Sequence, residues 1–295
     1  MSWQSLILIQ AFLTALATII TRVLARDRKT ANASMAITAS WFILLYICGI
    51  AFLPWFGHVH SQSFFHYGWR FVLGGTAFAL NNILTYKAFV YLDATIGSIL
   101  GTIAALFTVI GAALILNEEL SVTQAVGAMM LILAIIYGVL ATRVKPSKKT
   151  HRTLIIGAIY VVAASAFYAV AAVNEKSLLS HVSVGDYIVF GWGWQTIMAV
   201  AAALLIQPRA FKLLLRPAVL RWTALLGILR AVSGLCFMLS QIRSNNVALV
   251  TVISNFRLII VVILGFWLLK ERQKITQKFI ATGAATIALI IIFWK

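Results

Sequence analysis

Two arginines stand inside long apolar runs of the sequence, where a guanidinium group is unusual. Arg230 lies in "GILRAVSGLCF" (227–237) and Arg257 in "SNFRLIIVV" (254–262). An arginine at the centre of a bilayer costs about 2.5–3.5 kcal/mol on insertion scales, so it persists where a carboxylate, backbone carbonyls, a cavity or a ligand compensates. The guanidinium is a planar fork that matches carboxylate or phosphate. We therefore expect these two residues to help bind an anionic group.

The composition places the chain in a membrane. Of its 295 residues, 62% are hydrophobic and only 11% are charged, far less charge than a soluble domain carries. The net charge of +17 does not indicate nucleic acid, because the cations gather between apolar segments, as membrane topology requires. Cys48 and Cys236 lie in apolar segments and form neither a CxxC motif nor a disulfide framework.

The apolar segments predict an all-α polytopic membrane protein with ten transmembrane helices, since about 20 apolar residues cross a bilayer. The expected spans are 3–24, 33–56, 68–91, 94–116, 122–142, 153–175, 185–207, 222–243, 246–269 and 275–294. Lys and Arg concentrate in 22–29, 143–152, 209–221 and 270–278, which lie on one side if there are ten spans. The positive-inside rule makes that side cytoplasmic and both termini external.

The sequence also contains a repeat. "ILNEELSVTQ" (115–124) matches "LLKERQKITQ" (268–277) at a shift of 153 positions (271 − 118), which pairs Glu118 with Glu271. Five spans per half is an odd number, so the second half must be inverted relative to the first, as in many secondary transporters. We expect a five-helix repeat at 1–143, a basic linker at 144–152 and a second five-helix repeat at 153–295.

Ten short spans, a tight third-to-fourth connection and a Glu closing the fourth and ninth spans resemble the EamA-type transporters of the drug/metabolite transporter (DMT) superfamily. The resemblance covers essentially the whole chain. It implies that helices one to four and six to nine line a central cavity, while helices five and ten pack at the periphery. It also implies export or exchange of small molecules, and the family includes exporters of amino acids and other metabolites.

Polar side chains recur at helical spacing on six predicted spans; on the first, Gln10, Thr14, Thr18 and Arg22 repeat every four residues. Such arcs must face protein or a water-filled cavity. Interhelical hydrogen bonding is the alternative for any single residue. The candidate substrate-binding residues are Arg230, Arg257, Asn81, Asn82, Tyr86, Trp194, Gln195, Tyr168, Gln10, Thr14, Ser254 and Asn255.

The seven acidic residues bear on the arginines and on energy coupling. None is expected at the midplane, and Glu175, near the end of the sixth span, is the candidate for proton coupling. Arg230 and Arg257 could instead pair with Glu175, helix-end carbonyls or water. Under the shift of 153 they map to Ala77 and Ala104, so only one half carries these cations. Facilitated diffusion or exchange is at least as consistent with this inventory as proton antiport.

Glu118 and Glu119 have a structural interpretation. Ser121 and Gln124 have capping-box spacing at the start of the fifth helix, and the two acids just before it favour the positive end of its dipole.

We therefore predict a secondary transporter, an exporter or exchanger, of a small organic metabolite carrying a carboxylate or phosphate, such as an amino acid. A lipid or polyprenyl-phosphate flippase of the same fold is the alternative. An enzyme is disfavoured, because motifs such as H-E-x-x-H, G-x-S-x-G and the P-loop are absent. We expect no cofactor and no metal, a small-molecule substrate and membrane lipid as partners, no nucleic acid, a monomer or homodimer, and location in a bacterial inner membrane.

Overall fold

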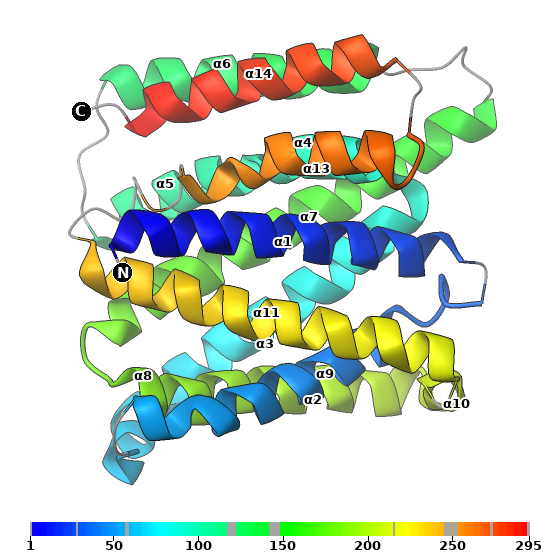
Figure 1. Cartoon of the computed structure of the whole chain (residues 1–295). Coiled ribbons are helices and arrows are strands. Elements are labelled where there is room, and N and C mark those ends of the chain that lie inside the picture. Colours follow the sequence, from blue (N-terminus) through cyan, green and yellow to red (C-terminus); the bar gives the residue numbers. More distant parts are fainter. Residues whose placement is uncertain are drawn as a thin grey trace.

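The computed structural model describes residues 2–27, 29–56, 59–116, 122–141, 148–214, 216–244, 250, 253–271 and 274–293. Glu118, Glu119, Ser121 and residues 144–147 of the expected linker lie outside these ranges. Within them the chain is all-helical (Figure 1). The helices are α1 (Trp3–Arg26), α2 (Ser34–Phe52), α3 (Ser61–Tyr91), α4 (Ala94–Gly101), α5 (Ile103–Leu116), α6 (Val122–Ala141), α7 (Lys148–Leu179), α8 (Val184–Asp186), α9 (Gly193–Ile206), α10 (Phe211–Leu214), α11 (Pro217–Arg243), α13 (Arg257–Trp267) and α14 (Ile275–Phe293).

Local sequence explains several of these helix starts. The Ser2 hydroxyl accepts a hydrogen bond from the Ser5 amide and caps α1. Ser183 and Asp186 form a capping box at α8. Pro217 begins α11 at a position where its missing N–H costs nothing.

Six helical segments among the described residues are long and apolar enough to cross a membrane: Trp3–Arg26, Ser34–Trp55, Ala94–Gly111, Arg152–Leu179, Val184–Ile206 and Pro217–Arg243. Three shorter apolar helices accompany them, at Ala125–Gly138, Ile253–Trp267 and Ile275–Ile291. The helix of the third expected span is longer than the span itself, since α3 begins at Ser61. Every expected span coincides with a helix or helix pair, but a total of ten membrane crossings stays a prediction.

Two expected spans are interrupted, which the apolar pattern did not indicate. The fourth is broken at Thr102, between α4 and α5, and the ninth at Phe256, immediately before α13. At both breaks the backbone makes i to i+3 hydrogen bonds: Ala105 N–H to Thr102 O (3.0 Å) and Ile259 N–H to Phe256 O (3.1 Å). The breaks therefore correspond within one residue under the shift of 153.

The helix contacts follow an approximate two-fold relation between the halves. α3 packs on α7 as α11 packs on α1, and α5 packs on α7 as α13 packs on α1. Likewise, α3 packs on α9 as α11 packs on α2. The relation exchanges α2 with α9 and α6 with α14, and the two members of each of these pairs pack on each other. In Figure 1 the α6–α14 pair forms an outer layer at the top, as the family resemblance implied for the fifth and tenth helices.

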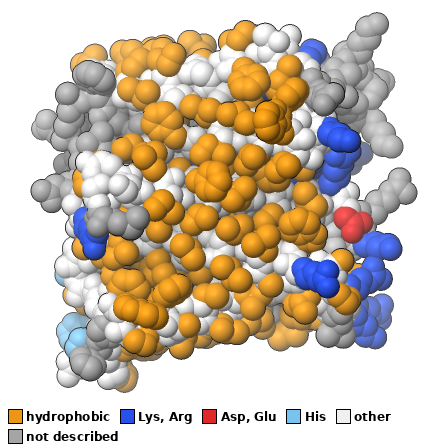
Figure 2. Space-filling model, viewed as in Figure 1, with side chains coloured by type: hydrophobic (Ala, Val, Ile, Leu, Met, Phe, Trp, Pro, Cys, Tyr) orange, Lys and Arg blue, Asp and Glu red, His pale blue; other side chains and the backbone are white. Residues whose placement is uncertain are grey.

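The two ends of the bundle differ in charge. At one end Gln207 bonds both to the Asn32 carbonyl (2.9 Å) and to the Met35 amide (3.0 Å), and Arg26 donates to the Leu269 carbonyl. These bonds bring segments 26–35, 207 and 269 together, so we call this the basic end. Figure 2 shows Lys and Arg gathered at that edge, on the right, with hydrophobic side chains across the middle.

The contact between α2 and α11 depends on Gly227. A Cβ there would stand 2.6 Å from Leu44 Cβ and 3.0 Å from the Trp41 carbonyl oxygen. Because these atoms cannot rotate away, Gly227→Ala should push the helices apart and destabilise the protein by about 1–3 kcal/mol. Thermal unfolding of purified protein measures this. Gly283→Ala in α14 is the matched control, since nothing lies within 4 Å of a Cβ there; equal melting temperatures for both variants would contradict the close-packing role.

Candidate functional site

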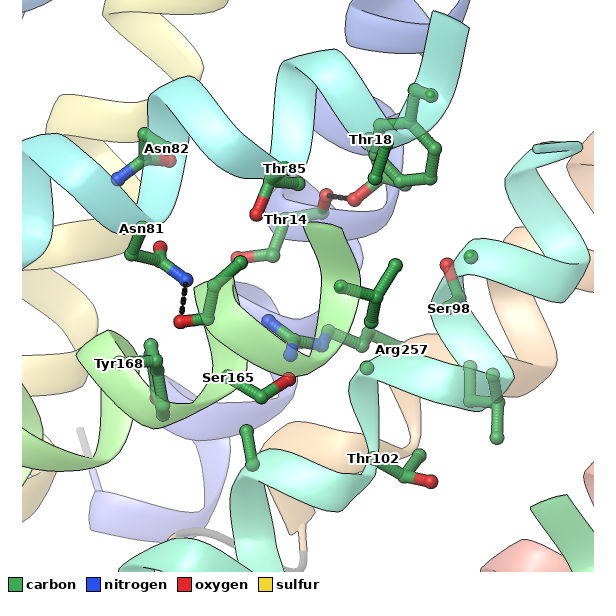
Figure 3. Close-up of a pocket in the computed structure, with 18 of the residues that line it drawn as sticks. Thr14, Thr18, Asn81, Asn82, Thr85, Ser98, Thr102, Ser165, Tyr168 and Arg257 are labelled. Carbon is green, nitrogen blue, oxygen red and sulfur yellow. Dashed lines mark hydrogen bonds between the residues drawn. The ribbon is translucent and has the colours of Figure 1, made fainter. Parts of the chain in front are cut away.

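Two adjoining cavities lie between the helices. The first has an empty volume of about 800 Å³ and is lined mainly by α1, α3, α4, α7 and the break regions (Figure 3). The second, of about 680 Å³, extends along α1, α2, α7 and α11. They share Thr14, Asn82, Tyr168, Arg230 and Arg257. The cavities therefore meet at the two arginines that the sequence singled out.

Broken helices supply part of the first cavity. Ser98, Gly101 and Thr102 come from the α4–α5 region, and Asn255 and Arg257 from the start of α13. A helix N-terminus carries a partial positive charge and free N–H groups, so it favours an anion. Arg257 occupies the first position of α13, where a cation opposes the helix dipole. Helix polarity and side-chain charge thus act in the same direction at this point of the cavity.

No carboxylate pairs with either arginine in the part of the chain that the structure describes. Arg230 Cζ stands 5.7 Å from the ring centroid of Trp41, and its Nε is buried without a hydrogen-bond partner. None of the ion pairs there involves Arg230 or Arg257. Glu175 therefore forms no ion pair with either arginine in this structure.

Glu175 nevertheless lines the second cavity. Its side chain is buried, and its carboxylate accepts a hydrogen bond from the Tyr187 hydroxyl (3.1 Å). It is the one acidic residue lining either cavity in the described ranges. The candidate coupling residue therefore reaches the pathway without an ion pair to the arginines.

Most predicted site residues line these cavities. They are Gln10, Thr14, Asn81, Asn82, Tyr168, Gln195, Arg230, Asn255 and Arg257. Several are already engaged: Gln10 Nε2 donates to Thr14 Oγ1 (3.1 Å), Thr14 Oγ1 lies 2.7 Å from Ser233 Oγ, and Asn81 Nδ2 donates to the Ala164 carbonyl (2.8 Å). Thr14 and Ser233 thus tie α1 to α11 beside the second cavity.

Three predicted residues lie elsewhere, and their assignment to the cavity is corrected. Tyr86 is 1% exposed and donates from its hydroxyl to the Thr30 carbonyl (3.1 Å). Trp194 Nε1 donates to Thr76 Oγ1 (3.3 Å), between α9 and α3. Ser254 is buried beside the break but lines neither cavity. Each faces protein rather than an open space.

Other lining residues were not predicted as part of the site. Gly97, Ser98, Gly101 and Thr102 lie in the segment "GSILGT" (97–102). Gly97 does pack, because a Cβ there would meet the Phe89 ring at 2.5 Å, whereas Gly101 faces open space. Two glycines followed by a threonine inside an apolar run were the available signal for the break.

A cluster of charged side chains lies beside the first cavity, at the basic end. Arg22 Nη2 is 3.3 Å from Asp93 Oδ1, Arg22 Nε is 3.5 Å from Glu271 Oε1, and Lys278 Nζ is 3.2 Å from Asp93 Oδ2. Glu271 Oε1 also accepts from the Ala94 amide (3.1 Å). Glu271 is the repeat counterpart of Glu118. It caps α4 of the first half, and not α14, the helix that follows Glu271 in the sequence.

A helical bundle with a polar, cation-lined cavity between two related halves defines a multi-pass membrane protein of the carrier class. The sequence matches the EamA-like transporter family over residues 1–140 and again over 155–294, and the chain belongs to that family. It is thus a DMT-type transporter and not a member of an enzyme family. One solved structure, described as the crystal structure of a protein, is similar with a TM-score of 0.65 at 14% identity, covering 97% of this chain and 94% of that one. No curated protein matches the sequence.

The corrected position of Tyr86 gives a test. Tyr86→Phe removes one of two hydrogen bonds to the buried Thr30 carbonyl, which keeps the bond from the Ala33 N–H (2.9 Å), so it should cost about 0.5–1.5 kcal/mol of stability. Substrate affinity should not change, because Tyr86 does not line the cavities. Thermal unfolding and ligand binding measure the two effects. Tyr91→Phe, at the exposed end of the same helix, is the control; a loss of affinity in Tyr86→Phe at unchanged stability would restore Tyr86 to the site.

Proposed function

We propose that the chain is a secondary transporter of a small organic metabolite carrying a carboxylate or phosphate, working by alternating access as an exporter or exchanger. Amino acids and related compounds are the first candidates. Location in a bacterial inner membrane, with the basic end in the cytoplasm, belongs to the same proposal. The observation that carries it is the pair of arginines where the two cavities meet, neither of which pairs with a carboxylate in the described part of the chain.

The magnitudes favour a ligand for these arginines. An arginine in a transmembrane helix costs about 2.5–3.5 kcal/mol on insertion scales. A cation–π contact such as that of Arg230 with Trp41 returns about 0.5–2 kcal/mol. The polar cavity offsets part of the difference, but a purely structural role would need no charge at all. An anionic substrate that accepts from both guanidinium groups offsets the remainder and explains why the cost is retained.

The broken helices support the same charge preference. In many transporters the N-termini of half-helices point at anionic groups of the substrate. Here the α5 break and the α13 break both line the first cavity, which also contains Arg257. Amide and hydroxyl groups of Asn82, Thr85 and Ser165 surround the same space. They could bind the neutral polar part of a metabolite, as side chains of this type commonly do.

Arg230 and Arg257 test the proposal directly. Replacing either with Met removes a half-buried charge that has no carboxylate partner among the described residues, so the ligand-free protein should be at least as thermally stable as the wild type. Transport into proteoliposomes should fall at least about tenfold, because the anion loses a charge-assisted partner. Lys replacements should recover only part of the rate, since they lack the fork. Arg221→Met, at an exposed position of α11, is the matched control.

The substrates for this assay come from a thermal-shift screen of amino acids, phosphorylated metabolites and nucleotides, because a ligand stabilises the protein it binds. Normal transport by both Met variants would overturn the anionic proposal. Movement of a fluorescent polyprenyl-phosphate or phospholipid between leaflets, with no uptake of soluble anions, would instead identify the flippase alternative.

The position of Glu175 predicts how transport is driven. Its carboxylate bonds to Tyr187 and forms no ion pair with the central arginines. We therefore expect exchange of labelled for unlabelled substrate without a pH gradient, and we expect Glu175→Gln to retain it. Counterflow in proteoliposomes with the pH clamped by a protonophore measures this. If accumulation requires a pH gradient and the Gln variant abolishes that requirement, Glu175 is a proton-coupling residue instead.

A further inference from the structure

At the basic end the first cavity is bordered by the Phe89 ring and, beyond it, by the charged cluster of Arg22, Asp93, Glu271 and Lys278. Phe89 lines that end of the cavity and packs against Gly97. Its own carbonyl accepts from Arg22 Nη1, so the ring and the ion cluster are directly connected. The side chain of Arg22 is 11% exposed, and those of Lys278 and Glu271 are 1% and 7% exposed, whereas that of Asp93 is 35% exposed. The cations are therefore largely buried, and solvent reaches the cluster at Asp93.

This cluster joins segments that are far apart in the chain and belong to different halves. Arg22 ends the polar stripe of α1, Asp93 lies between α3 and α4, and Glu271 and Lys278 flank the start of α14. Asp93 is held from both sides, by Arg22 of the first half and Lys278 of the second. Separating the halves at this end requires that at least one of these ion pairs break.

Arg22 also continues the row of polar residues on α1 (Gln10, Thr14 and Thr18) that lines the two cavities. Gln10 lines the second cavity, Thr14 lines both, and Thr18 lines the first. One turn further along the same face of α1 is Arg22. The stripe thus runs from one cavity through the other to the charged cluster.

The other half has no equivalent set of charges. Under the shift of 153 Arg22 corresponds to Glu175, Asp93 to Asn246 and Lys278 to Ala125. In the described part of the opposite end, the carboxylate contact between elements is that of Asp186 with His60 and Ser63 of the α3 start. That ion pair needs a protonated histidine. Among the residues that the structure describes, the ion pairs of Asp93 and Glu271 with Arg22 and Lys278 lie at the basic end.

We propose that Arg22, Asp93 and Lys278 form an ionic latch that closes the pathway at the basic end, and that Arg22 exchanges Asp93 for the substrate anion when this end opens. The inference rests on alternating access in the proposed function and adds the gate and its positioning residue. Asp93 is the acid on which the latch depends, because its carboxylate pairs with both Arg22 and Lys278, whereas Glu271 also accepts from the Ala94 amide at the start of α4. Burial, and then the neighbouring Asp93 carboxylate, raise the pKa of Glu271.

Accessibility of the first cavity tests the latch without any knowledge of the substrate. Ser98 lines that cavity (Figure 3), so Ser98→Cys, in a background with Cys48→Ala and Cys236→Ala, provides one reactive thiol. Its labelling by a membrane-impermeant maleimide is measured from each face, in inside-out and right-side-out vesicles. With the latch intact, labelling from the basic end should be the slower of the two.

Asp93→Asn and Arg22→Gln should each accelerate labelling from the basic end by about fivefold, as expected for the loss of one or two partly shielded ion pairs. Asp93→Glu, which keeps a carboxylate beside Arg22 and Lys278, should retain slow labelling, which shows that charge pairing and not loss of folding is responsible. Lys29→Gln, an exposed basic residue beside the same helix end, is the control and should change nothing.

Unchanged labelling in both single variants, or equal acceleration from both faces, would overturn the latch. These results do not depend on which molecule is carried. A functional latch in a protein that transports no anion would contradict the proposed substrate alone, and anion transport with unaltered labelling would contradict the latch alone.

Discussion

Hydrocarbon offers no hydrogen bonds, so every polar group in the membrane-spanning helices must find its partner inside the protein. Hydroxyl groups meet this constraint locally: Thr18 donates to the Thr14 carbonyl, Thr21 to Ala17 and Ser240 to Cys236, each four residues back along its own helix. A hydroxyl has a single donor, which one carbonyl satisfies. The guanidinium group has five donors in a fixed fork and a charge, and its own helix cannot satisfy it.

The cavities exist where that local solution fails. Arg230 and Arg257 need a polar space, and the bundle provides it by packing glycines closely elsewhere and by interrupting two helices that line the first cavity. Gly234 approaches the Trp192 ring, and Gly49 approaches the same ring from α2. These contacts bring α2, α9 and α11 together beside the second cavity. Close packing and an open polar space are thus adjacent, because the same helices supply both.

Two-fold similarity of the scaffold coexists with asymmetric chemistry. The helix contacts of one half are repeated in the other, and both broken spans stop at matching positions. Yet Arg230 corresponds to Ala77 and Arg257 to Ala104, and the charged cluster occurs at the basic end. Packing requires only similar apolar faces in the two halves, so the charged positions were free to diverge. The side chains that differ between the halves therefore carry the most information about function.

The sequence predicted the helices and the family well, because apolar length and basic connections are one-dimensional signals. It located Arg230, Arg257, Asn82 and Tyr168 at the cavity, since a charge or an amide in an apolar run has few other places to lie. It misplaced Tyr86 and Trp194, because helical periodicity indicates a face toward protein but does not distinguish a packed neighbour from a cavity. The breaks at Thr102 and Phe256 contain no proline, and the glycines before Thr102 were the one compositional signal.

The sequence did not reveal the charged cluster either. Arg22, Asp93 and Lys278 lie near the ends of different helices, far apart in the chain, and they come into contact only in the folded bundle. Their arrangement has an electrostatic consequence for the pathway. While Asp93 neutralises Arg22, the cationic side chains that line the two cavities are Arg230 and Arg257. Separation of Asp93 from Arg22 adds a third cation at the basic end of the same stripe on α1. An anion then meets cations along the whole route, and opening of the gate itself makes the route more favourable for it.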